Sequence, residues 1–264
     1  MGQPFDISYV YDYFVKLLPY IRISLVIVLS SIGVGLVVGM LVALPRLYKI
    51  PVLQRVSQVY ASFFRGTPIL IQLFLIYYGL PELLKLVSID VTKAPVLLFV
   101  IAAYGLHSAA YISEGIRAAV GAVDRGQVEA AYAVGMSGFQ AFARIVFPQA
   151  LAISVPILAN LVIATLKDTS LAFSLGVMEL TGKAQTLYTV SHQMLASYFA
   201  LALIYLIISL ILERVFAWIE RRLLRHEVRD EKEAKVPMGR RRLQRRLERQ
   251  LQAEVAFSEG GGGR

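Results

Sequence analysis

The chain has 264 residues, of which 57% are apolar and only 17% are charged. A soluble globular protein usually has about 25% charged residues, so this composition indicates a membrane protein. The chain contains no cysteine, which excludes disulfides and thiolate metal sites. Its net charge is +9, but the basic residues lie beside apolar segments, as membrane topology requires, so we expect no binding to nucleic acid.

The opening segment, residues 1–20, is predicted to lie outside the membrane. It lacks the basic region and small-residue cleavage site of a signal peptide, so we expect the first apolar run to be retained as a span. The segment is rich in aromatic side chains, which suit the level of the lipid headgroups: Tyr9, Tyr11, Tyr13, Phe14 and Tyr20. Contact with an external protein is the alternative role for these rings.

Five segments approach the roughly 20 apolar helical residues that cross a bilayer. They cover residues 21–44, 59–80, 94–119, 150–166 and 194–218. Prolines mark many of their edges: Pro19, Pro45, Pro81, Pro95 and Pro148. The fold class predicted here is therefore an all-α integral membrane protein with five transmembrane helices, covering residues 21–222, followed by a basic tail, 223–264.

The distribution of Lys and Arg predicts the orientation of these spans. One side has the richer set: Arg46, Lys49, Arg55, Arg117, Arg125, Arg144, Arg214, Arg221, Arg222 and Arg225. The other side has Lys16, Lys85, Lys93, Lys167 and Lys183. Because basic residues favour the cytoplasmic side, the N-terminus is predicted outside and the C-terminus inside.

Two glycines in the first span, Gly35 and Gly39, are separated by three residues. This spacing is typical of close helix packing in lipid. Two glycine-rich stretches, GVGLVVG and GVMELTGKA, have the wrong spacing for a nucleotide-binding loop. We therefore expect no nucleotide or other cofactor on this chain, so any ATP and magnesium would be bound by another protein.

A polar stretch interrupts the membrane segments at residues 126–148. A short helix begins near Gly126 and places Glu129 in its first turn, where a carboxylate favours the helix dipole, while Ala130 and Ala131 leave its surface flat. Gly135 then stops this helix. Ser137 and Gln140 predict a capping box at the start of a second helix, which Pro148 ends. An ordinary loop without a partner is the alternative interpretation.

This stretch resembles the EAA signature of the permease subunits of ATP-binding-cassette importers. The order is Glu129-Ala130-Ala131, then Gly135, Ile145 and Pro148, with Phe147 where leucine is usual. Three further blocks are similar to polar amino-acid permeases: RGTPILIQLFLIYYGLP (65–81), HSAAYISEGIRAAVGAVDRGQVEAA (107–131) and LKDTSLAFSLGVMEL (166–180). The resemblance covers residues 18–222 and does not extend to the tail.

The resemblance implies a multi-pass protein of the bacterial inner membrane that forms the pathway of an ATP-driven importer for polar amino acids. A cytoplasmic ATPase would dock on a coupling element, with Glu129, Ala130, Ala131, Gly135 and Ser137 as its contact residues. An external amino-acid-binding protein would deliver the substrate, and a second copy or a paralogue would complete the pore. The chain itself would have no catalytic residue and no metal ligand.

Polar side chains within a span normally face the bundle interior and mark a pathway. We predict that His107 and Tyr111, one turn apart in the third span, contact substrate together with Asn160, Asp168 and Thr169 of the fourth span and its outer end. Hydrogen bonding between helices is the alternative role for all five. Glu114 and Arg117 are expected to pair with each other or with neighbouring helices.

Two other functions compete with the importer. A secondary, ion-coupled transporter of small polar solutes would show inverted repeats or acidic ion sites deep in the spans, and neither is visible. An intramembrane enzyme would need a nucleophile with its base or a set of metal ligands, whereas the three histidines are scattered. For the tail, which has leucine at every fourth position over 243–251, a basic amphipathic helix on anionic lipid and a solvated extension are both open.

Overall fold

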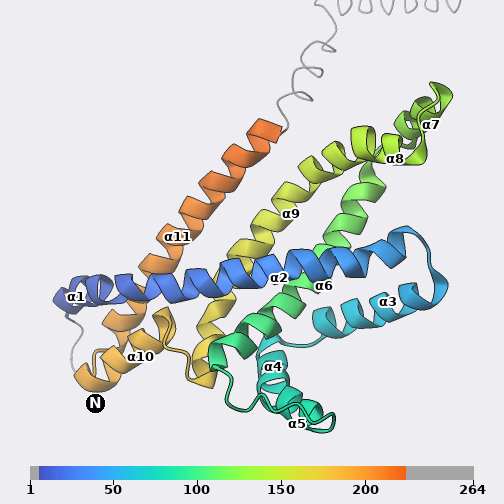
Figure 1. Cartoon of the computed structure of the whole chain (residues 1–264). Helices are drawn as coiled ribbons and strands as arrows, with labels where there is room; N and C mark the ends of the chain where they lie inside the picture. Colours follow the sequence, from blue (N-terminus) through green and yellow to red (C-terminus); the bar gives the residue numbers. More distant parts are fainter. Residues whose placement is uncertain (1–5, 224–264) are drawn as a thin grey trace, which may run out of the picture. The chain divides into compact units, whose positions relative to one another are not determined.

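The structure is a computed structural model that describes residues 6–223, all helical or connecting segments with no strand in that part of the chain. One compact unit extends to Glu220. Residues 224–264, the bulk of the predicted tail, lie outside the described residues. Figure 1 labels the α-helices, which are α1 (Ser8–Leu17), α2 (Ile21–Leu47), α3 (Pro51–Gly66), α4 (Ile69–Phe74), α5 (Leu80–Lys85), α6 (Val96–Ala122), α7 (Arg125–Ala133), α8 (Gly138–Ala141), α9 (Phe147–Asp168), α10 (Leu180–Ser191) and α11 (Met194–Leu223).

Four helical stretches in the described residues are long and apolar enough to cross a membrane. They are Ser8–Leu47, Val96–Ala122, Gly138–Leu175 and Met194–Leu223. A bent pair, Pro51–Gly66 with Ile69–Lys85, gives a fifth span if the two halves cross as one. The predicted all-helical membrane fold is therefore confirmed. The predicted orientation of the termini stays a prediction.

The second predicted span, 59–80, is broken near its beginning and belongs to this bent pair rather than to one continuous helix. α3 ends at Gly66, and the chain turns by 112° before it continues as Ile69–Lys85. Thr67 is extended (φ −115°, ψ 146°) because the ring of Pro68 disfavours the helical conformation in the residue before it. Pro68 also offers no amide proton to continue the ladder of α3.

α2 and α6 pack closely along their length at two glycines. A Cβ on Gly35 would lie 2.9 Å from Cβ of Ser108, and one on Gly39 would lie 2.9 Å from the carbonyl oxygen of Ala109. These distances are too short for any side chain. The predicted role of the Gly35–Gly39 pair in helix packing is therefore confirmed.

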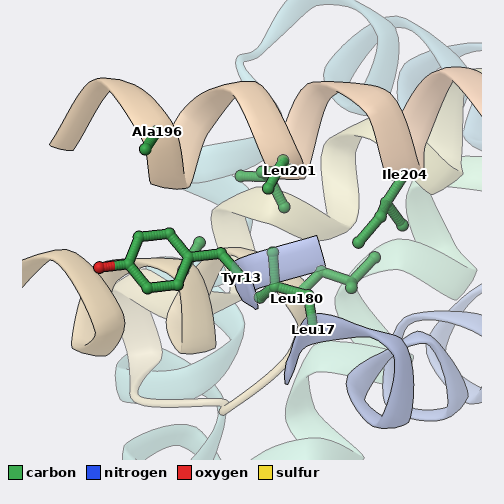
Figure 2. Packing of buried hydrophobic residues seen from close by; sticks show 8 residues of the cluster. Tyr13, Leu17, Leu180, Ala196, Leu201 and Ile204 are labelled. Carbon is green, nitrogen blue, oxygen red and sulfur yellow. The ribbon is translucent and has the colours of Figure 1, made fainter. Parts of the chain in front are cut away.

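A buried apolar cluster joins α1, α10 and α11. Figure 2 shows Leu201 and Ile204 of α11 facing Leu180 of α10 and Leu17 of α1. Tyr13, one of the five aromatic residues predicted at the headgroup level, belongs to this cluster and is only 2% exposed. Tyr11, by contrast, is exposed. The aromatic residues of the opening segment are therefore divided between packing and surface.

The sequence predicts that the helix beginning near Gly138 ends at Pro148, but in the structure this helix does not end there. It continues through a π-helical turn, Phe142–Val146, directly into α9. The wider turn accommodates a proline, which cannot donate the ordinary helical hydrogen bond. The second helix of the polar stretch and the fourth span therefore form one continuous helical segment (Figure 1).

Candidate functional site

The predicted coupling element consists of α7, a tight turn and α8. α7 begins at Arg125, and its N-cap is Asp124, whose side chain accepts a hydrogen bond of 2.9 Å from the amide of Gly126. Glu129 therefore lies beyond the first turn, and the expected stabilisation of its carboxylate by the helix dipole is not realised there. The cap that sequence reasoning missed is the aspartate just before the helix, a residue type that favours this position.

The turn between the two helices has the predicted geometry. Gly135 has φ +82°, in the left-handed region that side chains avoid. Ser137 accepts from the amide of Gln140 (3.3 Å), and Gln140 Oε1 accepts from the amide of Ser137 (2.9 Å). The capping box predicted from these two residues is thus confirmed. The angle between α7 and α8 is fixed by the glycine and by this cap.

Four of the five predicted coupling residues are exposed: Glu129, Ala130, Gly135 and Ser137. Ala131 is 4% exposed and packs inward, so the expectation of a flat surface formed by both alanines was wrong. Large apolar side chains instead dominate this surface, with Tyr132, Val134 and Phe139 all more than half exposed. Apolar residues in a stretch too polar to enter lipid were the signal that sequence reasoning overlooked. Such a patch is typical of a protein-binding surface.

Gln72 organises the break in the second span, and sequence reasoning missed it. Its side chain is buried, and its Nε2 donates to the carbonyl oxygens of Phe64 (2.8 Å) and Thr67 (2.9 Å). These carbonyls lie at the end of α3 and would otherwise have no partner from the helix. The only signal in the sequence is a lone amide in an apolar run that follows a proline.

His107 is hydrogen-bonded to the same glutamine, with Nδ1 2.9 Å from Gln72 Oε1. The two carbonyls on Nε2 fix the orientation of the amide, because a carbonyl can only accept. Oε1 therefore faces His107, Nδ1 is the donor, and Nε2 of the ring is left for a second partner. His107 lies 5.0 Å from Tyr111 between ring centroids, so the predicted adjacency of these two side chains is confirmed.

Arg65 adds a cation to this polar cluster. Its guanidinium carbon lies 5.7 Å from the ring centroid of Tyr111. Its Nη1 is also 3.3 Å from Oε1 of Glu114. Glu114 is therefore shared by three helices, because Arg46 of α2 and Arg117 of α6 bind it as well, at 2.6 Å and 3.0 Å. The predicted pairing of Glu114 with Arg117 and with neighbouring helices is confirmed.

The other predicted pathway residues lie on α9 and just after it. Asn160 is exposed, and within residues 6–223 its side chain has no hydrogen-bond partner. The backbone carbonyl of Asp168 accepts from the hydroxyl of Tyr104. Thr169 is fully buried, and its hydroxyl donates to the carbonyl of Leu166 (2.7 Å). The structure joins His107 and Tyr111 and shows no bond from either of them to these three residues within its described part.

The sequence matches the model of a protein family described as "binding-protein-dependent transport system inner membrane component" over residues 35–225. It is 45% identical to the L-cystine transport system permease protein TcyL of Bacillus subtilis (strain 168), over 87% of this chain and 96% of the relative. It is 42% identical to the probable amino-acid ABC transporter permease protein PatM of Vibrio harveyi, over 85% and 99%.

Solved structures agree with these relatives. A crystal structure of an amino acid ABC transporter with histidines superposes with a TM-score of 0.74 at 29% identity, and the match covers 83% of this chain and 100% of the other. An inward-facing structure of the MetNI methionine ABC transporter shares the fold, with a TM-score of 0.59 at 18% identity over 82% and 95%. The chain therefore belongs to the family of binding-protein-dependent transport system inner membrane components, as a multi-pass permease subunit of an ABC transporter rather than an enzyme.

Proposed function

We propose that this chain forms half of the pathway of an ATP-driven importer of polar amino acids. The observation that carries the proposal is its similarity along nearly the whole chain to permeases named for cystine and other amino acids. An ATPase bound on the predicted cytoplasmic side supplies the energy, with ATP and magnesium held by that subunit. A binding protein outside the membrane delivers the substrate.

The ATPase docks on the coupling element, through Glu129, Ala130, Gly135 and Ser137. The exposed apolar side chains Tyr132, Val134 and Phe139 support a protein contact at this place. Because the segment that begins at α8 continues without interruption into α9, movement of the docked element would be transmitted directly to the fourth span. Ala131 contributes from inside, where it packs the element against the rest of the chain.

A second copy or a paralogue completes the pore. Asn160 is exposed in the middle of a span, and an amide that faced lipid there would be costly. Lys167 is exposed on the same helix, two turns further along. These two exposed polar side chains indicate that this face of α9 borders a water-filled pathway or another subunit. Asn160, His107 and Tyr111 are the proposed substrate contacts on this face and on α6.

Asp168 and Thr169 take a lesser part in this proposal. Asp168 lies at the end of α9, half-buried, and can reach the pathway near its predicted outer end. Thr169 is bonded within its own segment, so it would contact substrate only after that segment rearranges. Leu161, beside Asn160, places an apolar side chain where an acid could have bound a cationic substrate. We therefore favour neutral or acidic amino acids over arginine and lysine.

Reconstitution tests the proposal. The permease is incorporated in proteoliposomes with its ATPase and binding protein, and uptake of the twenty standard amino acids and L-cystine is measured with and without ATP. We expect at least one polar amino acid to accumulate only when ATP is present. Uptake driven by an ion gradient without ATP would support a secondary transporter instead. Failure to accumulate any amino acid, with an active ATPase, would contradict the proposed substrate class.

A further inference from the structure

Three guanidinium groups surround one carboxylate at Glu114. Oε1 is 2.6 Å from Arg46 Nη1 and 3.3 Å from Arg65 Nη1, while Oε2 is 3.0 Å from Arg117 Nη2 and 3.1 Å from its Nε. A single negative charge thus faces three positive charges. Glu114 lies eight residues before the end of α6, about 12 Å inside the span. Arg46 lies one residue before the end of α2, so the group is near the predicted cytoplasmic ends of these helices, and its surplus of positive charge attracts an anion.

The three arginines do not share the carboxylate equally. Arg46 has the shortest contact, and its side chain is 11% exposed. Arg117 holds the second oxygen with two nitrogens. Arg65 contacts the carboxylate only at 3.3 Å, through Oε1, which Arg46 also contacts. The side chain of Arg65 is 46% exposed. Within residues 6–223 the guanidinium of Arg65 makes no side-chain hydrogen bond besides this ion-pair contact, so it is the least neutralised cation of the group.

The position of Arg65 suits a group that binds a passing anion. It lies one residue before the end of α3, next to the 112° break, where the chain leaves the helical conformation. Its guanidinium lies over Tyr111, whose ring also contacts His107. Tyr111 is 37% exposed and the Arg65 side chain is 46% exposed, so both groups are accessible. The His107 ring, 5.0 Å from that of Tyr111, adds a polar group, and its Nε2 has no hydrogen-bond partner within residues 6–223.

We propose that Arg65 binds the α-carboxylate of the amino acid during its passage through the membrane. This inference rests on the proposed function and names the permease group that recognises its substrate. A guanidinium presents its donors in a planar fork that matches a carboxylate with two parallel hydrogen bonds. The carboxylate is common to all α-amino acids. A cation fixed in the pathway can therefore bind any amino acid that the binding protein delivers, whatever its side chain.

The test compares the binding of amino acids that have a free α-carboxylate with that of analogues that lack it. The complex of permease and ATPase is prepared without binding protein in phosphatidylcholine nanodiscs, which offer no anionic lipid as a competitor. Binding of the twenty standard amino acids and L-cystine, each compared with its α-carboxamide, is measured by saturation-transfer difference NMR. The variants are Arg65→Gln and Arg65→Lys. Arg55→Gln is the matched control, because it removes a guanidinium from the exposed surface of the same helix.

For the wild type we expect at least one free acid to bind about tenfold more tightly than its carboxamide, as the loss of a charged hydrogen-bonded pair predicts. Arg65→Gln should lower the affinity for the free acid to that for the carboxamide. The affinity for the carboxamide itself should not change. Arg65→Lys should retain part of the preference, since it keeps the charge without the fork. Arg55→Gln should behave like the wild type.

Three results would overturn the inference. They are equal binding of acid and carboxamide by the wild type, a preference for the acid that persists in Arg65→Gln, and absence of binding by a complex that transports normally. An equal loss of acid and carboxamide in Arg65→Gln would indicate a structural role only, and it also counts against the inference. The uptake assay of the wild type tests the proposed function separately. If no amino acid accumulated in that assay, the proposed function itself would be refuted.

Discussion

Gln72 and His107 are joined by a hydrogen bond of 2.9 Å that connects the break in the second span to the middle of α6. The same glutamine satisfies two carbonyl groups at the end of α3. One buried amide therefore stabilises an interrupted helix and sets the orientation of a histidine in the proposed pathway. In this protein the irregular backbone within a predicted span and the polar cluster are therefore parts of one arrangement, in which a buried side chain satisfies the backbone groups freed by the break.

Replacement of Gln72 by leucine should destabilise the protein. The carbonyls of Phe64 and Thr67 would lose their donor in a buried place, at a cost of about 2–4 kcal/mol for the two together. Equilibrium unfolding in mixed micelles of detergent and SDS measures the change. Gln58→Leu is the control, because Gln58 is exposed on α3. Equal stability of both variants would show that Gln72 does not hold the break.

The contact between α2 and α6 predicts opposite outcomes for two glycines of one helix. Gly39→Ala places a methyl group 2.9 Å from the carbonyl of Ala109 and from Cγ2 of Ile112, and should cost about 1–3 kcal/mol. A Cβ on Gly33 meets no atom within 4 Å, so Gly33→Ala should be neutral or stabilising by up to about 1 kcal/mol. The same unfolding assay compares them, and a neutral Gly39→Ala would refute the close packing.

The turn of the coupling element predicts a graded series at Gly135. Valine strains the left-handed conformation by about 1–2 kcal/mol, so Gly135→Val should uncouple ATP hydrolysis from uptake. Asparagine tolerates this conformation, and Gly135→Asn should retain most transport. Gly138→Ala is the control in the same element, since its Cβ would meet only Tyr132 Oη at 3.7 Å. Coupled uptake at the wild-type level in Gly135→Val would contradict the docking role.

Asn160→Leu tests the fourth span. Because Asn160 is exposed and makes no side-chain hydrogen bond within residues 6–223, its replacement should leave stability and assembly unchanged. Transport should fall about tenfold, the loss expected for one hydrogen bond to a charged substrate group. Uptake rates in proteoliposomes and size-exclusion chromatography give the two quantities. Unchanged transport would remove Asn160 from the pathway, whereas a loss of assembly would place it at a subunit contact.

The spans and the coupling turn could be predicted from local patterns. Long apolar runs, a Gly–Gly spacing and a Ser–Gln capping box each depend on residues close together in the sequence. The break at Thr67 was also visible in principle, because Pro68 restricts the residue before it, but the apolar run around it favoured a single span over 59–80.

The polar cluster could be predicted only in part. His107 and Tyr111 share one helix face, so periodicity brings them together. Arg46, by contrast, lies 68 residues from Glu114, and Gln72 lies 35 residues from His107. Such contacts depend on how the helices pack, which one sequence does not specify. The burial of Ala131 was missed for the same reason, because it depends on what lies beneath α7.

Cysteine cross-linking can show whether the ATPase docks on the coupling element. The chain has no native cysteine, so Val134→Cys gives a single thiol at an exposed position of this element. Val190→Cys, which is also highly exposed and lies on α10 at the predicted outer side, is the control. We expect a cross-link from position 134, and none from 190, to an ATP-binding subunit identified by mass spectrometry. A folded, transport-competent Val134→Cys complex that yields no such product, or equal products from both positions, would contradict this docking.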